Sequence, residues 1–218
     1  MADVAHSKTE HTQTNWNGVV GYLRIEAARA SVARVDVFAP DHKARVRIEL
    51  EAFDSDNRWP LYWTEPHEDR LKLRFEFGDG TPPLELTHPV TIDSAYTPVE
   101  IDIDLPGAAR RWDEFDPVVH RLSVEWLRDG VPQDQHSVPF GIRSFRREGR
   151  RLTLNGRPVF LRGTLDCCIF PLTGYPPTDH EGWRKVFGTA RAYGLNHIRY
   201  HSYCPPRAAF EVADEMGM

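Results

Sequence analysis

The stretch Leu154–Gly163, LNGRPVFLRG, separates two parts of the chain that have different hydropathy patterns. Its Asn155-Gly156 dipeptide suits a two-residue type I′ turn, in which both central positions need a positive φ. The dipeptide therefore predicts a hairpin between Arg151–Leu154 and Pro158–Arg162. The Val-Phe-Leu run that follows shows no alternation of apolar and polar residues, which is typical of a strand covered on both faces.

Upstream of residue 143, short segments of alternating apolar and polar residues are separated by Pro, Gly, Asp and Asn. A period of two is typical of strands with one buried and one solvated face. The predicted strands are Ser31–Phe38, Arg45–Ala52, Arg70–Phe77, Leu84–Val90, Val99–Leu105, His120–Leu127 and Gln135–Phe140. Seven short strands in about 110 residues favour an immunoglobulin-like β-sandwich, which we place at residues 29–143.

Residues 144–218 change to an alternation of strands and helices. Thr178 and Glu181 form a capping box that predicts the start of a helix, and Gly194 ends it. Apolar residues recur at helical spacing behind this box, namely Trp183, Val186, Phe187 and Ala190. The pattern predicts an amphipathic helix with one buried face.

A second strand and a second helix follow, at Leu195–Tyr200 and Arg207–Met216. Gly217 ends this helix, whose predicted apolar face consists of Ala209, Phe210, Ala213 and Met216. Two successive βα units with short loops predict a parallel sheet.

The length allows only part of a barrel. A closed (β/α)₈ barrel needs about 250 residues, so each βα unit takes roughly 30. Pro158–Met218 accommodates two such units, and we expect them to be a piece of a larger architecture. Residues 1–28, with an apolar run at Val19–Ile25, suggest the last strand and linker of an upstream domain.

Composition excludes several functional classes. The 218 residues carry a net charge of −5 and are 40% hydrophobic, which is ordinary for a globular protein. The absence of a basic stripe argues against a nucleic-acid partner, and no run of about 18 apolar residues could span a membrane. Cys167, Cys168 and Cys204 cannot form a disulfide framework, and the polar N-terminus does not resemble a secretory signal. The compartment stays open.

Five segments together resemble glycoside hydrolase family 2, the β-galactosidase and β-glucuronidase family. Leu154–Gly163 resembles the junction between its immunoglobulin-like sandwich and its first barrel strand. Gly194–Arg199 (GLNHIR) resembles its second barrel strand, and Phe210–Gly217 (FEVADEMG) the helix that follows. Asn15–Gly18 is similar to the end of the family's sugar-binding jelly roll, and Trp112–Pro117 to a late Trp-x-x-x-x-Pro segment of its sandwich.

The resemblance implies a multidomain β plus α/β chain: a jelly-roll tail (1–28), a sandwich (29–143) and the first two βα units of a truncated TIM barrel (144–218). It also implies retaining hydrolysis of O-glycosidic bonds by two carboxylates about 5–5.5 Å apart. In the family these are glutamates on the fourth and seventh barrel strands, so we assign no catalytic carboxylate here and expect the isolated chain to be inactive. The expected partners are a carbohydrate, the rest of the parent enzyme and a second copy in a homo-oligomer, with no cofactor.

Four residues match or adjoin substrate-site positions of the family. Arg199 corresponds to an arginine that orients the nucleophile, because a guanidinium fork keeps a carboxylate ionised. The alternative is a surface arginine at the end of a strand. His201 and Ser202 follow it, where the family more commonly has Ser-His-Tyr, so either of them could face the sugar. Asp166, just past the first strand, could bind a sugar hydroxyl or could instead cap a nearby loop amide.

A zinc site is a competing prediction, because Asp166, Cys167, Cys168, His201 and Cys204 could converge at the barrel mouth. Against it, the chain has no Cys-x-x-Cys pair, and free cysteines commonly serve as small buried hydrophobic residues.

Two features of the sandwich have alternative interpretations. Asp102 and Asp104 could be paired carboxylates, but their alternation with apolar residues predicts a solvated face. Trp59, Tyr62 and Trp63 could stack on sugars or could pack within the sandwich. The alternative function is therefore a non-catalytic carbohydrate-binding or interaction module built on the sandwich.

Overall fold

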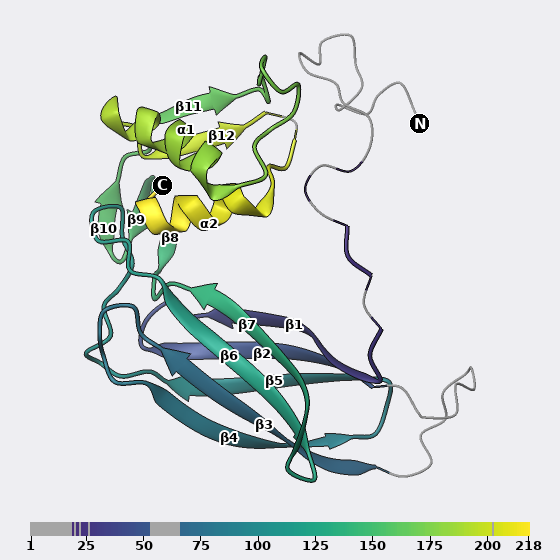
Figure 1. The fold of residues 1–218 in the computed structure, drawn as a ribbon. Coiled ribbons are helices and arrows are strands. Elements are labelled where there is room, and N and C mark those ends of the chain that lie inside the picture. The colour runs from purple at the N-terminus through teal and green to yellow at the C-terminus, as the bar shows by residue number, and fades with distance from the viewer. Residues whose placement is uncertain (1–18, 20, 22, 26, 53–65, 202) are drawn as a thin grey trace. The chain divides into compact units, whose positions relative to one another are not determined.

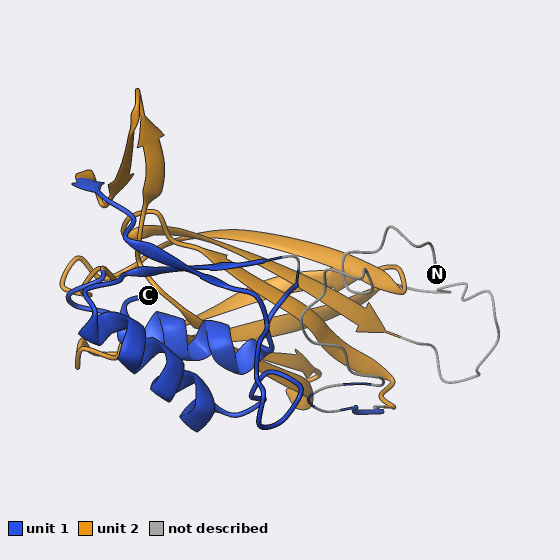
Figure 2. Cartoon of the chain, turned by 90° about the horizontal axis from the view of Figure 1, so that it is seen from above, with its two compact units in different colours: residues 1–25, 114–117, 158–218 blue, residues 26–113, 118–157 orange. Residues whose placement is uncertain are grey.

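A computed structural model describes residues 19, 21, 23–25, 27–52, 66–201 and 203–218, which are mostly β-sheet with two α-helices (Figure 1). The aromatic segment with Trp59, Tyr62 and Trp63 lies outside the described residues. The chain divides into two compact units (Figure 2). Unit 1 comprises residues 1–25, 114–117 and 158–218, and unit 2 comprises residues 26–113 and 118–157.

Two antiparallel sheets form the main body of unit 2. One has the strand order β1-β2-β5 and the other β4-β3-β6-β7 (Figure 1). The strands are β1 (Ala30–Phe38), β2 (Lys43–Ala52), β3 (His67–Glu76), β4 (Leu84–Ile92), β5 (Tyr96–Asp104), β6 (His120–Arg128) and β7 (Val131–Phe140). These are the seven strands that the alternation predicts, with ends that shift by a few residues.

The alternation of side chains in each strand supplies one shared core. In β2, Val46, Ile48 and Leu50 are buried, whereas the charged residues between them are exposed. In the other sheet, β3 contributes Leu71, Leu73 and Phe75 and β6 contributes Leu122, Val124 and Trp126 to the same apolar cluster. On β5, Asp102 and Asp104 are exposed, which confirms the predicted solvated face.

One carboxylate, that of Asp69, is buried in this core and is paired with a guanidinium and an indole N–H. Asp69 is only 2% exposed, and burying an ionised carboxylate is costly unless it is paired. Its Oδ2 accepts hydrogen bonds from the Trp126 indole Nε1 at 2.8 Å and from Arg128 Nη2 at 3.0 Å. The same guanidinium lies over the Trp126 ring, so the three side chains form one packed group.

Three of the four edge strands of the two large sheets in unit 2 carry proline. Pro89 lies in β4, Pro98 in β5, and both Pro132 and Pro139 in β7. Proline has no N–H to donate, so within sheets it occurs mainly in edge strands. The edges at β4, β5 and β7 therefore cannot offer an unbroken row of backbone donors.

A hairpin leads out of the sandwich: β8 (Phe145–Glu148), β9 (Arg151–Leu154) and β10 (Arg157–Val159) form a sheet in the order β10-β9-β8. Asn155 and Gly156 have φ of 53° and 77°, which confirms the predicted type I′ geometry.

The sequence predicts that the strand after the Asn155-Gly156 turn continues through Arg162 and is covered on both faces. This prediction is wrong. β10 ends at Val159, and Phe160 is 78% exposed. The Phe160 carbonyl accepts a hydrogen bond from the Asn196 side chain, so the chain leaves the ladder at this point. The first parallel strand is instead β11 (Gly163–Asp166).

Unit 1 contains this strand, paired in parallel with β12 (His197–Tyr200), in the register Gly163↔His197 to Asp166↔Tyr200. The predicted parallel sheet is confirmed for these two strands. Two helices, α1 (His180–Ala192) and α2 (Arg207–Met216), pack on each other and on the sheet. Their shared core consists of Trp183, Phe187, Ala208, Ala209 and Val212, with Ile198 and Tyr200 of β12 packed against it.

Two details of the helices differ from the sequence expectation. The N-cap of α1 is Asp179 rather than Thr178, because the extended Asp179 backbone lets its carboxylate accept from the Gly182 N–H. In α2, Phe210 is 48% exposed and Val212 takes its place in the core. Gly217 ends α2 with a φ of 71°, as predicted.

Asp79, in the loop after β3, ties two loops of unit 2 together. Its Oδ1 accepts from the Thr81 N–H at 2.9 Å and its Oδ2 from the Arg110 N–H at 2.5 Å. Burial alone would raise the pKa of Asp79, but these hydrogen bonds and that of the Thr81 hydroxyl outweigh burial and lower the pKa to about 2. An unfolded aspartate has a pKa of roughly 3.9, so the ionised carboxylate stabilises the folded state.

We expect Asp79→Asn to lower the melting temperature of the sandwich by a few degrees at pH 7 and by much less at pH 2. The stabilisation is fully present above the unfolded pKa of about 4 and is lost as pH falls through the folded value near 2. Thermal unfolding at both pH values, with exposed Asp104→Asn as the control, measures the difference. An equal loss at both pH values would contradict this role.

Candidate functional site

The candidate site lies at the carboxyl ends of β11 and β12 in unit 1. Parallel strands end at the same edge of a sheet, and ligands of α/β folds bind at that edge. Asp166 is the last residue of β11 and pairs in register with Tyr200, the last residue of β12. Asp166 therefore belongs to the strand itself. The sequence-based prediction places it in the loop just past the strand.

Asn196 holds the amino ends of the two strands together. Its Oδ1 accepts from the Arg162 N–H at 2.8 Å, and its own backbone N–H donates to the Arg162 carbonyl at 3.0 Å. Its Nδ2 donates to the Phe160 carbonyl and, at 2.5 Å, to Glu114 Oε2. The Asn196 side chain thus helps to fix the register of β11 and β12. That register determines which residues lie side by side at the carboxyl ends of the two strands.

Arg199 points away from the helices. Its neighbours in β12, Ile198 and Tyr200, pack against the helical core, and side chains alternate along a strand. Arg199 therefore shares the opposite face with Leu165, its register partner in β11. It is exposed, and its guanidinium bonds to no described residue. Its five N–H donors are available to a carboxylate.

Of the two residues after β12, the structure describes one. The His201 N–H donates to the Asp166 carbonyl at 2.7 Å, which continues the parallel pairing, and the His201 side chain is exposed. Ser202 lies outside the described residues. Which of them contacts a sugar stays a prediction.

Asp166 caps an amide of its own loop. Its Oδ1 accepts from the Cys168 N–H at 2.7 Å, and Cys168 has a φ of 59°, in the left-handed region. This bond supports the alternative in which Asp166 organises the loop after β11. The bond engages one carboxylate oxygen, so binding of a sugar hydroxyl by Asp166 stays a prediction.

Three neutral acids surround Asp166. Burial and the Asp166 charge raise the pKa of Tyr200, Tyr203 and Cys168, in the last case to about 11. The Tyr203 hydroxyl is buried, and its interaction with the Asp166 side chain is one of the causes that raise its pKa. Each group stays protonated at neutral pH, so none of them is a ready nucleophile.

Sequence reasoning brings Asp166 and Cys168 together but misses Tyr200 and Tyr203, because no motif connects these tyrosines to Asp166. The in-register pairing of β11 with β12 is the signal that could have found the cluster. The predicted zinc site is not formed. The described residues include no group of three or more His, Cys, Asp or Glu side chains that could hold a metal ion. Cys168 is buried, whereas Cys204 is exposed.

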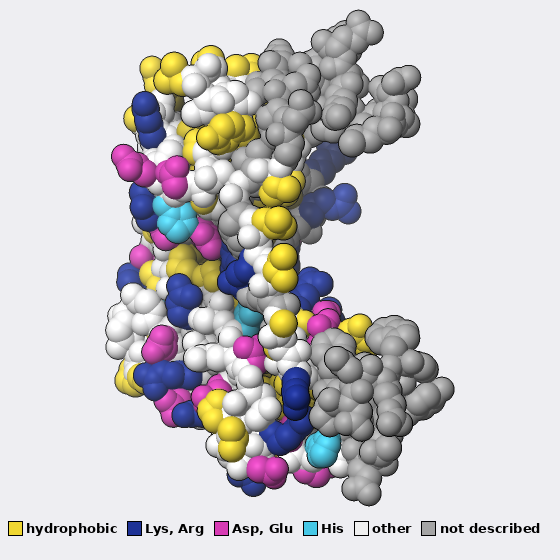
Figure 3. All heavy atoms as spheres, turned by 45° about the vertical axis from the view of Figure 1, so that its right-hand side comes forward, with side chains coloured by type: hydrophobic (Ala, Val, Ile, Leu, Met, Phe, Trp, Pro, Cys, Tyr) yellow, Lys and Arg dark blue, Asp and Glu magenta, His cyan; other side chains and the backbone are white. Residues whose placement is uncertain are grey.

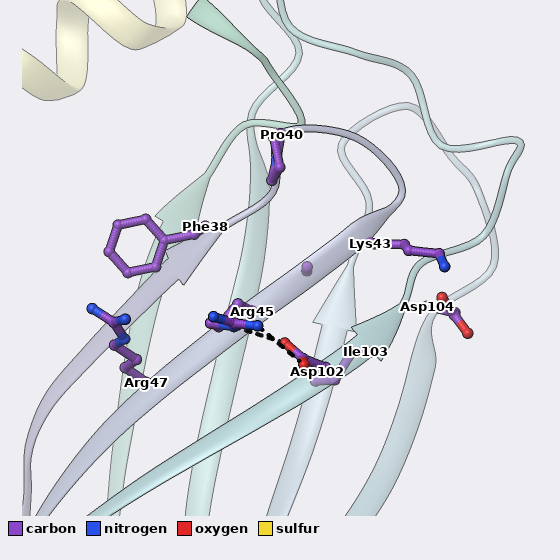
Figure 4. A pocket seen from close by; sticks show the side chains of 9 residues that line it. Phe38, Pro40, Lys43, Arg45, Arg47, Asp102, Ile103 and Asp104 are labelled. Atoms are coloured by element: carbon purple, nitrogen blue, oxygen red, sulfur yellow. Dashed lines mark hydrogen bonds and ion pairs between the residues drawn. The ribbon is translucent and has the colours of Figure 1, made fainter.

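Unit 2 carries a separate hollow of about 640 Å³ on the outer face of the β1-β2-β5 sheet (Figure 4). Its lining includes Phe38, Arg47, Arg45 and Asp102. The Arg47 guanidinium lies over the Phe38 ring at 5.3 Å, and Arg45 Nε donates to Asp102 at 2.8 Å. An aromatic face beside polar side chains could hold a sugar, which makes this hollow a second candidate site.

Comparison with known proteins relates the chain to glycosidases, although no family model matches it. It is 22% identical over 178 residues to a β-galactosidase of Vibrio vulnificus strain YJ016, covering 78% of this chain and 17% of the relative. It is 25% identical over 111 residues to an exo-β-D-glucosaminidase of Amycolatopsis orientalis, covering 45% of this chain and 10% of the relative. The chain thus spans less than a fifth of the length of these relatives.

Solved structures show the same fold. A glycosyl hydrolase family 2 member of Bacteroides cellulosilyticus matches with a TM-score of 0.68 at 19% identity, over 84% of this chain and 24% of that one. A family 2 β-galacturonidase of Eisenbergiella tayi, bound to galacturonate, matches with a TM-score of 0.66 at 16% identity, over 88% and 33%. The chain is therefore similar in sequence to glycosidases and in fold to members of glycoside hydrolase family 2.

We expect Asn196→Ala to loosen the β11–β12 pair. The change leaves the Arg162 N–H and the Glu114 carboxylate without this partner, a loss of about 1–3 kcal/mol in local stability. Backbone amides of residues 163–166 and 197–200 should then exchange with solvent at least tenfold faster. Thr189→Ala, which removes an exposed helix hydrogen bond, serves as the control. Unchanged exchange in Asn196→Ala would show that the pairing does not depend on this side chain.

Proposed function

We propose that the chain is part of a retaining family 2 glycoside hydrolase that cleaves O-glycosidic bonds. In this proposal residues 1–28 end a sugar-binding jelly roll, residues 29–143 form an immunoglobulin-like sandwich, and residues 144–218 open a (β/α)₈ catalytic barrel. The similarity to glycosidases supports it, as does the division of seven strands into sheets of three and four. The observation that carries it is Arg199, which lies near the carboxyl end of a parallel strand, faces away from the helices and has no partner among the described residues.

The chemistry follows from that position. A retaining glycosidase uses one carboxylate as the nucleophile and a second carboxyl group as acid and then base. A guanidinium that donates two parallel hydrogen bonds keeps the first carboxylate ionised and aimed at the anomeric carbon. Arg199 would take this role, with Asp166, His201 and Ser202 as candidate sugar contacts. Neither catalytic carboxylate is assigned to the 218 residues, so the carboxylates would come from elsewhere in the parent enzyme.

We expect the isolated 218-residue chain to show no turnover of aryl glycosides. In a polypeptide that joins these residues to the carboxylates, Arg199→Ala should lower kcat by at least a hundredfold, because the nucleophile loses its charge-assisted partner. Arg184→Ala, which removes an exposed ion pair between α1 and α2, is the matched control and should change kcat less than twofold. Activity in the isolated chain that disappears with Arg199→Ala would place the chemistry within these residues and refute the proposal.

The hollow on the β1-β2-β5 sheet favours a second candidate, a carbohydrate-binding module without catalysis. Isothermal titration of the chain with neutral oligosaccharides tests it, because an occupied hollow predicts binding that Phe38→Ala weakens at least tenfold through loss of the stacking face. Phe115→Ala, which removes an exposed ring outside this hollow, serves as the control. Binding that Phe38→Ala leaves unchanged would rule out this site.

A further inference from the structure

The hairpin after the sandwich carries a local excess of positive charge. Residues 143–157 contain six arginines and one glutamate, in a chain whose net charge is −5. Five of these arginines lie on the hairpin strands or their turn, and all five are exposed: Arg146, Arg147, Arg150, Arg151 and Arg157. We call residues 145–157 the basic hairpin. In Figure 2 the β8–β9 part extends away from the two sandwich sheets of unit 2.

Among the described residues, these arginines have no acidic partner, whereas several arginines of the sandwich do. On the β1-β2-β5 sheet, Arg45 and Arg47 form ion pairs with Asp102 and Glu100 at 2.8 and 2.7 Å. On the face of the molecule shown in Figure 3, acidic side chains (magenta) and basic side chains (dark blue) are interspersed. The five arginines of the basic hairpin form no ion pair with any described residue.

The single acid of the hairpin does not compensate them. Glu148 is the register partner of Arg151, yet no ion pair joins the two. Glu148 Oε1 instead accepts from the Thr153 hydroxyl at 3.2 Å. The guanidinium groups are therefore left to an external anion.

An aromatic ring lies among these charges. Phe145 and Arg147 are two residues apart in β8 and so share one face of the hairpin, with Leu154 and Leu152 opposite them. Phe145 is 52% exposed. A pyranose ring could pack on Phe145 while the neighbouring guanidinium binds a carboxylate on the same sugar, because a guanidinium fork matches carboxylate geometry.

We propose that the basic hairpin is a binding site for acidic polysaccharide, with uronate carboxylates paired to its arginines. The choice of a polysaccharide rests on the proposed glycosidase function, and the choice of an acidic one rests on the five unpaired guanidinium groups. Arg147 shares the face of Phe145, Arg146 and Arg151 lie on the opposite face, and Arg150 lies in the turn between β8 and β9. A flexible polymer with one carboxylate per sugar that passes around this turn can therefore contact several arginines. The site would hold the polymer next to the enzyme without taking part in cleavage.

Binding of polygalacturonate to the full 218-residue chain tests the proposal, with the fully methyl-esterified polymer as a matched ligand that lacks the charges. We expect the triple variant Arg147→Gln, Arg150→Gln, Arg151→Gln to weaken binding of polygalacturonate at least tenfold. The charge-matched triple variant Arg70→Gln, Lys72→Gln, Arg121→Gln removes exposed cations from β3 and β6 and should change the affinity less than twofold. The affinity of the unmodified chain should also fall steeply between 50 and 300 mM salt.

Three results would overturn the proposal. An equal loss of affinity in both triple variants would show that only net charge matters. Equally tight binding of the esterified polymer would exclude the carboxylates, and tighter binding of duplex DNA than of polygalacturonate would identify a nucleic-acid surface instead. If the hairpin triple fails to fold in a thermal melt, the single variant Arg150→Gln at the turn replaces it, with a loss of at least twofold expected and no loss counting against the site. The binding assay involves no bond cleavage, so its failure and a failure of the glycosidase proposal are distinguishable.

Discussion

The pairing of β11 with β12 through Asn196 is the constraint on which the candidate site depends. Parallel strands have no turn to set their register, so something else must align them. One side chain does so here, because Asn196 binds the backbone of residues 160 and 162 and the carboxylate of Glu114. Once the amino ends are aligned, Asp166 lies beside Tyr200, and Arg199 is placed on the face opposite the helices. The positions of Asp166 and Arg199 therefore follow from contacts at the other end of the strands.

The local sequence predicts much of this fold because each element has its own signal. A period of two identifies the seven strands of the sandwich, and the Asn155-Gly156 dipeptide identifies the hairpin turn. The α1 cap differs by one position because Thr178 and Asp179 are both good capping residues, and only the backbone conformation decides between them. Phe160 is apolar without being buried, and an apolar run alone cannot show that.

The candidate site is less predictable than the fold. The sequence predicts a strand at Leu195–Tyr200 with Arg199 near its end, and the structure places Arg199 there. The polar surroundings of Asp166 cannot be read in this way, because they depend on the left-handed backbone of Cys168 and on a tyrosine from another loop. Neither has a local sequence signal, since left-handed residues are usually glycine or asparagine. Such clusters form only when tertiary contacts fix both loops.

The prolines in β4, β5 and β7 have a consequence for how the sandwich meets other molecules. A partner that extends a sheet by adding a strand needs consecutive backbone N–H donors along its edge. Proline interrupts that row in each of these strands, so recognition by strand addition is disfavoured there. Contacts of partners with these three edges must then be made by side chains, and side chains can change from one related protein to the next without altering the fold. The scaffold and its specificity can thus evolve independently.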